Sequence, residues 1–178
     1  MIKKILTLSA LVTALVARTQ AADTNVKLSD VHLCCNSCVK GVEKAIGTVS
    51  GATVQSDKDA RTVTITAPDQ PTAQKAVNAL VAAGYFGKSS DSAIKVQAPS
   101  GAKKAKVDGK VQSLKVAGVH LCCGKCVTSV NEALKTVEGV KANTAEKGAQ
   151  SFEVTGDFAG SEVFTALKKA GLAGKVAQ

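Results

Sequence analysis

Residues 31–39 read VHLCCNSCV and residues 119–127 read VHLCCGKCV, so the chain contains one cysteine-rich segment twice. The two segments lie 88 residues apart and differ only in the pair of residues before the third cysteine. The match continues at the same offset, where 42–51 and 130–139 share apolar residues at helical spacing and end at a glycine. A module repeated at a fixed offset predicts two domains of the same fold.

Each copy predicts the same order of secondary structure. Apolar and polar residues alternate at 26–28 and 114–116, which is typical of a half-buried strand. After the cysteines, apolar residues recur at helical spacing over 39–49 and 127–137, and a glycine follows. In the first copy we then expect strands at 52–55 and 62–66, a helix at 71–83 and a last strand at 93–96. In the second copy the corresponding strands are expected at 140–143 and 151–155, the helix at 161–170 and the last strand at 175–178. This order predicts an α+β protein with two ferredoxin-like βαββαβ domains in tandem, each an antiparallel sheet with two helices on one face.

Composition predicts where these domains begin and end. Residues 1–22 are expected to be a signal peptide, because two lysines precede an apolar stretch that is shorter than a comfortable membrane span. Residues 23–97 and 111–178 would form the two domains, and the Gly-, Pro-, Ser- and Lys-containing segment 98–110 a flexible linker. We therefore expect a secreted or periplasmic protein with no stable membrane insertion after signal removal. A retained N-terminal anchor is the alternative.

Charge and residue types exclude other classes of function. The chain has 23 Lys and Arg against 14 Asp and Glu, a net charge of +9. Nucleic-acid binding would need a basic stripe with stacking aromatics, but the basic residues are scattered among acidic ones and aromatics make up only 3%. We expect no nucleic-acid partner. The sequence has no oxygen nucleophile motif, carboxylate pair or phosphate loop that would indicate catalysis, so we expect no enzyme.

Two cysteines separated by two residues, between a strand and a helix, place two sulfur atoms within reach of one ion. Cys35 and Cys38 have this spacing, as do Cys123 and Cys126. The helix dipole and free backbone N–H groups at a helix start favour the thiolate and lower a thiol pKa. Thiolates prefer soft ions such as Cu(I), Zn(II) and Hg(II), whereas Ca²⁺ and Mg²⁺ prefer oxygen. The spacing therefore predicts a soft-metal site in each copy.

These loops, in this order of elements, resemble heavy-metal-associated (HMA) domains, the module of copper chaperones, metal-transporting ATPase tails and periplasmic mercury-scavenging proteins. That family has a Met-x-Cys-x-x-Cys loop, and Leu33 and Leu121 stand at its Met position. Gly84 and Tyr85 match a Gly-Tyr pair of the family, which the second copy lacks. The resemblance implies that both cysteines of each Cys-x-x-Cys bind the ion, that the ion is Cu(I), and that a metal-transporting ATPase or another metal carrier is a partner.

The additional cysteines, Cys34 and Cys122, depart from the family pattern, and His32 and His120 lie two residues before them. Three thiolates would make a trigonal site, and three thiolates with an imidazole a tetrahedral one. Adjacent residues point apart in extended chain, however, so Cys34 could instead serve a second ion or a site shared between the copies. The candidate metal ligands are Cys34, Cys35, Cys38, Cys122, Cys123, Cys126, His32 and His120.

Two other roles for the cysteines remain open at this point. A disulfide framework is one, since exported proteins oxidise readily, but three cysteines within five residues would close only a very short loop. Thiol–disulfide exchange is the other, because it also uses Cys-x-x-Cys at a helix start. We expect capture, transfer or sequestration of Cu(I), with Hg(II) or Zn(II) scavenging and a redox module as alternatives.

Overall fold

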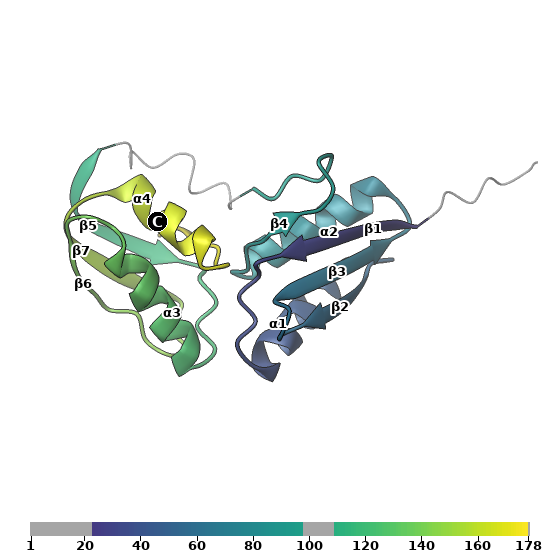
Figure 1. Ribbon diagram of the computed structural model, residues 1–178, viewed down its shortest axis with the longest axis horizontal. Helices are drawn as coiled ribbons and strands as arrows, with labels where there is room; N and C mark the ends of the chain where they lie inside the picture. Colours follow the sequence, from purple (N-terminus) through teal and green to yellow (C-terminus); the bar gives the residue numbers. More distant parts are fainter. Residues whose placement is uncertain (1–22, 98–108, 178) are drawn as a thin grey trace, which may run out of the picture.

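The computed structural model describes residues 23–97 and 109–177, which form two α+β units (Figure 1). The first contains β1 (Thr24–Ser29), α1 (Asn36–Ile46), β2 (Thr53–Asp57), β3 (Thr62–Ala67), α2 (Gln70–Ala82) and β4 (Lys88–Ser89). The second contains β5 (Lys110–Ala117), α3 (Gly124–Lys135), β6 (Val140–Asn143), β7 (Ser151–Ala159), α4 (Gly160–Lys169) and β8 (Lys175–Val176). The sheets have the strand orders β2-β3-β1-β4 and β6-β7-β5-β8, with every pair antiparallel. The predicted fold class is confirmed.

Strand alternation and helix periodicity place the core between sheet and helices. In β3, Val63, Ile65 and Ala67 are buried and the residues between them are partly exposed. In α1 the buried face includes Cys38 and Val42, one helical turn apart. The third cysteine of the first loop therefore lies on the same stripe that packs against the core. Cys126 has the equivalent place in α3.

The last strand of the first unit differs from the prediction. Residues 93–96 form no strand; β4 lies at Lys88–Ser89 and pairs with the end of β1. Ile94 is nevertheless buried, in a loop held by Gln74, whose side-chain amide exchanges two 2.8 Å hydrogen bonds with the backbone of Lys95. The alternation of apolar and polar residues predicted the burial of Ile94 correctly. The segment is held in place by the Gln74 side chain of α2, however, and not by a neighbouring strand.

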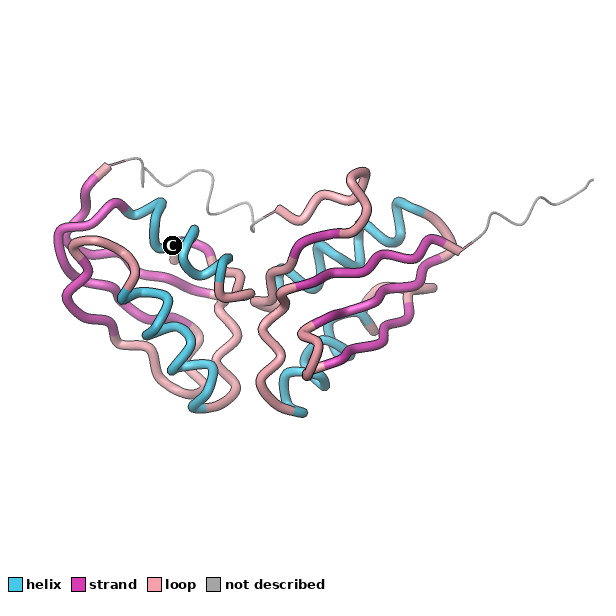
Figure 2. The backbone as a smooth tube through the Cα atoms, viewed as in Figure 1, coloured by secondary structure: helices cyan, strands magenta, loops and turns pink. Residues whose placement is uncertain are grey.

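The two units contact each other through backbone groups that follow α2 and α4. Tyr85 and Leu172 form an antiparallel bridge. The amide of Phe86 donates to the carbonyl of Gly171 at 3.0 Å, and the amide of Ala173 donates reciprocally to that of Gly84 at 2.8 Å. Figure 2 shows these loops meeting at the centre of the molecule. The contact holds the two cysteine loops side by side.

Glycine is required at this contact. Gly84 and Gly171 have φ angles of +93° and +79°, which side chains rarely adopt. A Cβ atom at Gly84 would overlap the amide nitrogen of His120, and one at Gly171 would overlap the carbonyl of Asp30. Each unit therefore brings its glycine against the chain that leads into the other unit's cysteines.

The expected signal peptide at 1–22 and residues 98–108 of the expected linker lie outside the described residues. β5 begins at Lys110, the last residue of that expected linker. Within 23–97 and 109–177, no helix combines the length and the apolar character needed to cross a bilayer.

Candidate metal centre

Each cysteine loop joins the first strand of its unit to the following helix. Cys35 and Cys123, both extended, are the N-cap residues of α1 and α3. The amide of Cys38 donates to the carbonyl of Cys35 at 3.0 Å, and that of Cys126 to Cys123 at 3.1 Å. This first turn sets the Sγ–Sγ distances of the two Cys-x-x-Cys pairs at 3.8 and 3.7 Å. The predicted proximity of each pair is confirmed.

The additional cysteines lie in the same cluster. The sulfur of Cys34 is 3.5 Å from that of Cys38, and the sulfur of Cys122 is 3.6 Å from that of Cys126. The sulfurs of Cys34, Cys35 and Cys38 all lie within 4.8 Å of one another, so the two adjacent side chains do not point apart as they would in a strand. The question left open by the sequence is thereby answered: the first cysteine of each loop reaches the other two.

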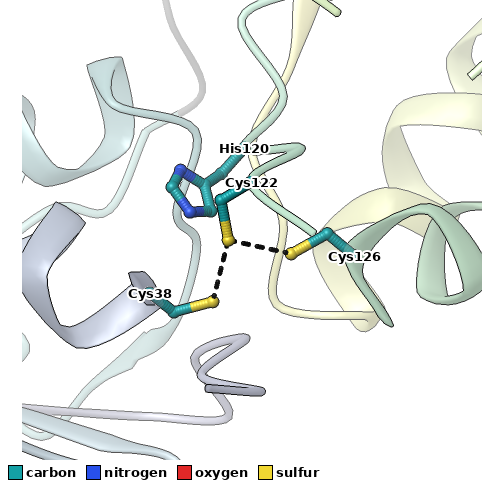
Figure 3. Close-up of side chains that lie close together, drawn as sticks. All are labelled: Cys38, His120, Cys122 and Cys126. Carbon is teal, nitrogen blue, oxygen red and sulfur yellow. Dashed lines mark hydrogen bonds between the residues drawn. The ribbon is translucent and has the colours of Figure 1, made fainter. Parts of the chain in front are cut away.

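The two loops form one cluster, not two. The sulfur of Cys34 lies 3.5 Å from that of Cys123 and 3.6 Å from that of Cys126, although these residues belong to different units. The sulfurs of Cys38 and Cys122 are likewise 3.6 Å apart, and Figure 3 marks this contact with a dashed line. All six thiols therefore share a single site at the contact between the units.

The third cysteine of each loop is more buried than a thiol in a solvent-exposed metal-binding loop would be. Cys38 and Cys126 have no exposed surface, while the other four cysteines are partly exposed. Cys38 contacts Cys122 of the second loop, and Cys126 contacts Cys34 of the first loop, so each loop helps to cover the third cysteine of the other. An ion would reach the cluster through the partly exposed thiols.

The two histidines flank the cluster in different surroundings. A ring nitrogen of His120 lies within 4.8 Å of the sulfurs of Cys38, Cys122 and Cys126. A ring nitrogen of His32 lies within 4.8 Å of the sulfurs of Cys34 and Cys126. His32 is only 7% exposed, and its Nε2 has no hydrogen-bond partner. Both are placed to bind an ion held by the thiols.

Tyr85 explains the difference between the histidines. It is fully buried, as packing residues are, and its hydroxyl donates to the carbonyl of Cys38 at 2.9 Å and lies 3.0 Å from Nε2 of His120. Gly41 in α1 leaves the space for this hydroxyl. Leu172, the counterpart of Tyr85, has no hydroxyl to offer to His32. Sequence reasoning singled out Tyr85 only through the Gly-Tyr pair, which the second copy lacks, and it missed this link between the units.

A position at the start of a helix was expected to lower the thiol pKa values, but only some of them are lowered. A hydrogen bond from the Cys126 thiol lowers the pKa of Cys38 to about 2, and the same bond raises the pKa of Cys126. Burial raises the pKa of Cys34, and it raises that of Cys122 to about 12. At Cys123 burial is outweighed by hydrogen bonds, the largest from the Cys126 amide, and its pKa falls to about 6. Without metal, the cluster therefore carries fewer negative charges than it has sulfur atoms.

The sulfurs are free thiols. A disulfide bond is about 2.0 Å long, whereas the closest sulfurs here are 3.5 Å apart. Six soft donors in mutual contact form a candidate site for soft metal ions, and they offer little to Ca²⁺ or Mg²⁺.

Two cavities border the cluster, and residues of both units line each of them. One of about 510 Å³ is lined by Cys34 and by five charged residues, the basic Lys58, Arg61 and Lys169 and the acidic Asp59 and Glu132. The other, of about 350 Å³, is lined by Cys122 and, apart from His120, by uncharged residues. The first is therefore the more electropositive approach to the cluster.

Comparison with known proteins gives only distant similarity. No protein-family model matches the chain, and no curated protein matches it significantly. Among solved structures, the N-terminal soluble domains of Bacillus subtilis CopA share 14% identity over 87% of this chain and 94% of theirs, with a TM-score of 0.31. The first two RRM domains of yeast poly(U)-binding protein Pub1 share 12% identity over 86% and 98%, with a TM-score of 0.23. These scores carry no argument about function, which depends on the cysteine cluster.

Proposed function

We propose that this protein is an exported, HMA-like metal-binding protein that captures, transfers or sequesters Cu(I) through its paired CCxxC loops. The observation that carries the proposal is the contact of six thiols from both units in one cluster. Their hydrogen-bonded Sγ–Sγ distances are 3.5–3.9 Å. Export is proposed on the signal-like sequence of 1–22.

Geometry favours Cu(I) among the soft ions. Three sulfurs placed around an ion in their plane, with metal–sulfur bonds of about 2.3 Å, lie about 4.0 Å apart. The observed separations match this value after a small expansion. Cu(I) accepts trigonal thiolate coordination and is selected by soft sulfur ligands. Hg(II) shares the preference for sulfur and is the competitor to test.

Zinc is the second candidate, because the described part of the chain contains one group of four donors. Cys38, Cys122, Cys126 and His120 place one ligand atom each within 4.8 Å of the others. Three thiolates and one imidazole form a tetrahedral zinc site. Zn(II) would therefore be expected to occupy this corner of the cluster and leave the other thiols free.

Transfer would proceed by ligand exchange. A thiolate of a metal carrier, such as a metal-transporting ATPase, would attack the ion beside a partly exposed cysteine and form a shared intermediate. Cys34 lines the larger cavity, where the Arg61 guanidinium would favour an anionic metal–thiolate complex. The proposed role involves binding and exchange, with no catalytic step.

Anaerobic titration of the reduced protein with Cu(I) and Zn(II), each against a competing chelator, tests this function. We expect Cu(I) to be bound in preference to the chelator, and the double variant Cys34→Ser/Cys122→Ser to bind fewer ions. Loss of Cu(I) to a weak chelator would contradict the proposal. Insulin reduction tests the redox alternative, and turnover there without metal binding would favour that alternative.

A further inference from the structure

The six sulfur atoms have a regular arrangement. Eight sulfur pairs lie 3.5–3.9 Å apart, and four further pairs lie within 4.8 Å. Each sulfur thus has four close neighbours among the other five. This is the contact pattern of the corners of an octahedron. The opposite corners are the pairs Cys34 with Cys122, Cys35 with Cys126, and Cys38 with Cys123.

Three triangular faces of this octahedron match donor groups that could hold an ion, and a fourth shares Cys34 and Cys126 with another such group. One face is Cys34, Cys35 and Cys38, and a second is Cys35, Cys122 and Cys123. A third is Cys38, Cys122 and Cys126, to which His120 is added. The fourth is Cys34, Cys123 and Cys126, whose sulfurs are 3.5–3.7 Å apart and beside which His32 lies.

These four faces alternate around the octahedron, so each sulfur belongs to two of them. If one ion with three sulfur ligands lay on each of these faces, every sulfur would bind two ions and bridge them. No sulfur would be left over, and no ion would lack a third ligand.

We infer that the cluster is one polynuclear site that binds four monovalent soft ions, with all six thiolates bridging. The inference rests on the proposed function in requiring a soft, thiolate-bound ion, and it adds the number of ions and their common site. Three of the four faces take sulfurs from both loops, so a separate unit could complete only one face. The site is thus incomplete without the contact between the units.

Charge is consistent with this loading. Four monovalent cations and six thiolates have a net charge of about −2, because all six thiols lose their protons. Arg61 lines the cavity beside Cys34 and is tied to the loop by a 3.4 Å hydrogen bond from its Nε to the carbonyl of Val31, whereas Lys58 in the same cavity is paired with Asp59 at 2.6 Å. The Arg61 guanidinium would offset part of the excess negative charge.

Native mass spectrometry of the full chain during anaerobic Cu(I) titration tests the inference. We expect a cooperative change from the metal-free form to four ions per chain, with little of the intermediate forms. Cys34→Ser removes one ligand from two faces, so its load should fall from four ions to two. Ser37→Ala, in the same loop but without a sulfur, should keep four.

The contact between the units is tested with Gly84→Ala/Gly171→Ala, whose new methyl groups would overlap the opposite loops. This variant should lose the cooperative step and bind at most two ions. Gly148→Ala is the matched control, since Gly148 has a φ of +81° but open space around it, and it should keep four ions. Circular dichroism of both variants verifies folding, and the Cys34 result decides the question if the interface variant is unfolded.

Two results would overturn the inference in distinguishable ways. Two ions bound independently, with the same load in the interface variant, would exclude the shared cluster and leave soft-metal binding intact. No Cu(I) retained by the wild-type chain would overturn the proposed function as well.

Discussion

The hydroxyl oxygen of Tyr85 lies 3.0 Å from Nε2 of His120, and this contact joins the two units beside the cysteine cluster. The two ring centroids are 4.5 Å apart. The Tyr85 hydroxyl has one proton and donates it to the carbonyl of Cys38, so it accepts a hydrogen bond from His120. That assignment places the imidazole proton of the metal-free protein on Nε2.

Removal of the Tyr85 hydroxyl should weaken the metal-free protein. Tyr85→Phe leaves a buried carbonyl and an imidazole N–H without their partner, so the free energy of unfolding should fall by about 1–3 kcal/mol. Urea denaturation under reducing conditions measures this change. Thr165→Val, which deletes an exposed helix hydroxyl, should change stability by less than about 0.5 kcal/mol. Equal values for the two variants would argue against the link.

The two histidines should respond oppositely to replacement. His32→Leu removes a buried nitrogen that has no partner, so the metal-free protein should be as stable as wild type or more stable. His120→Leu removes the partner of Tyr85 and should be destabilising by about 1 kcal/mol or more. Thermal unfolding of both metal-free variants gives the comparison. A larger loss of stability for His32→Leu would contradict this description of the site.

Zinc affinity should depend on one histidine. His120 completes the group of three thiols and one imidazole, whereas His32 has no such group of four within the described residues. His120→Leu should therefore weaken Zn(II) binding by about tenfold or more, and His32→Leu should have a smaller effect. Competition with a fluorescent chelator measures both. Equal effects of the two substitutions would place Zn(II) elsewhere.

Alkylation should distinguish the thiols of the metal-free protein. Cys123 is partly exposed and has a pKa of about 6, so at neutral pH it is mostly thiolate and should react first with iodoacetamide. Its rate should fall as the pH falls below about 6. Cys122, with a pKa raised to about 12, should react more slowly, and buried Cys38 should be protected although its pKa is low. Peptide mass mapping identifies the order, and preferential labelling of Cys122 would be inconsistent with it.

The repeated pattern allowed the fold to be predicted because each element has a local signal. Buried positions in β3 alternate, those of α1 recur at helical spacing, and Gly84 follows α2. The last strand was misplaced at 93–96 because the burial of Ile94 has the same sequence signature as strand alternation. Only the three-dimensional position of Gln74 distinguishes the two.

The site was predicted in part. The spacing of Cys35 and Cys38 follows from one helical turn, and the chain itself therefore encodes it. The contact of Cys34 with Cys123 depends on how the two units pack, for which a repeat carries no periodic signal. The pKa values of Cys38 and Cys126 diverge for the same reason. The largest cause of each shift is the hydrogen bond between these two thiols, which lie in different units, and the position of a cysteine at the start of a helix does not reveal it.

X-ray absorption at the copper edge, on protein loaded with four equivalents of Cu(I), tests the shared cluster most directly. Four ions on alternate faces of a sulfur octahedron with bonds of about 2.3 Å would lie about 2.7 Å from one another. We predict three sulfur neighbours per copper and a clear copper–copper distance near that value. Two sulfur neighbours with no copper neighbour would show isolated Cys-x-x-Cys sites and contradict the account.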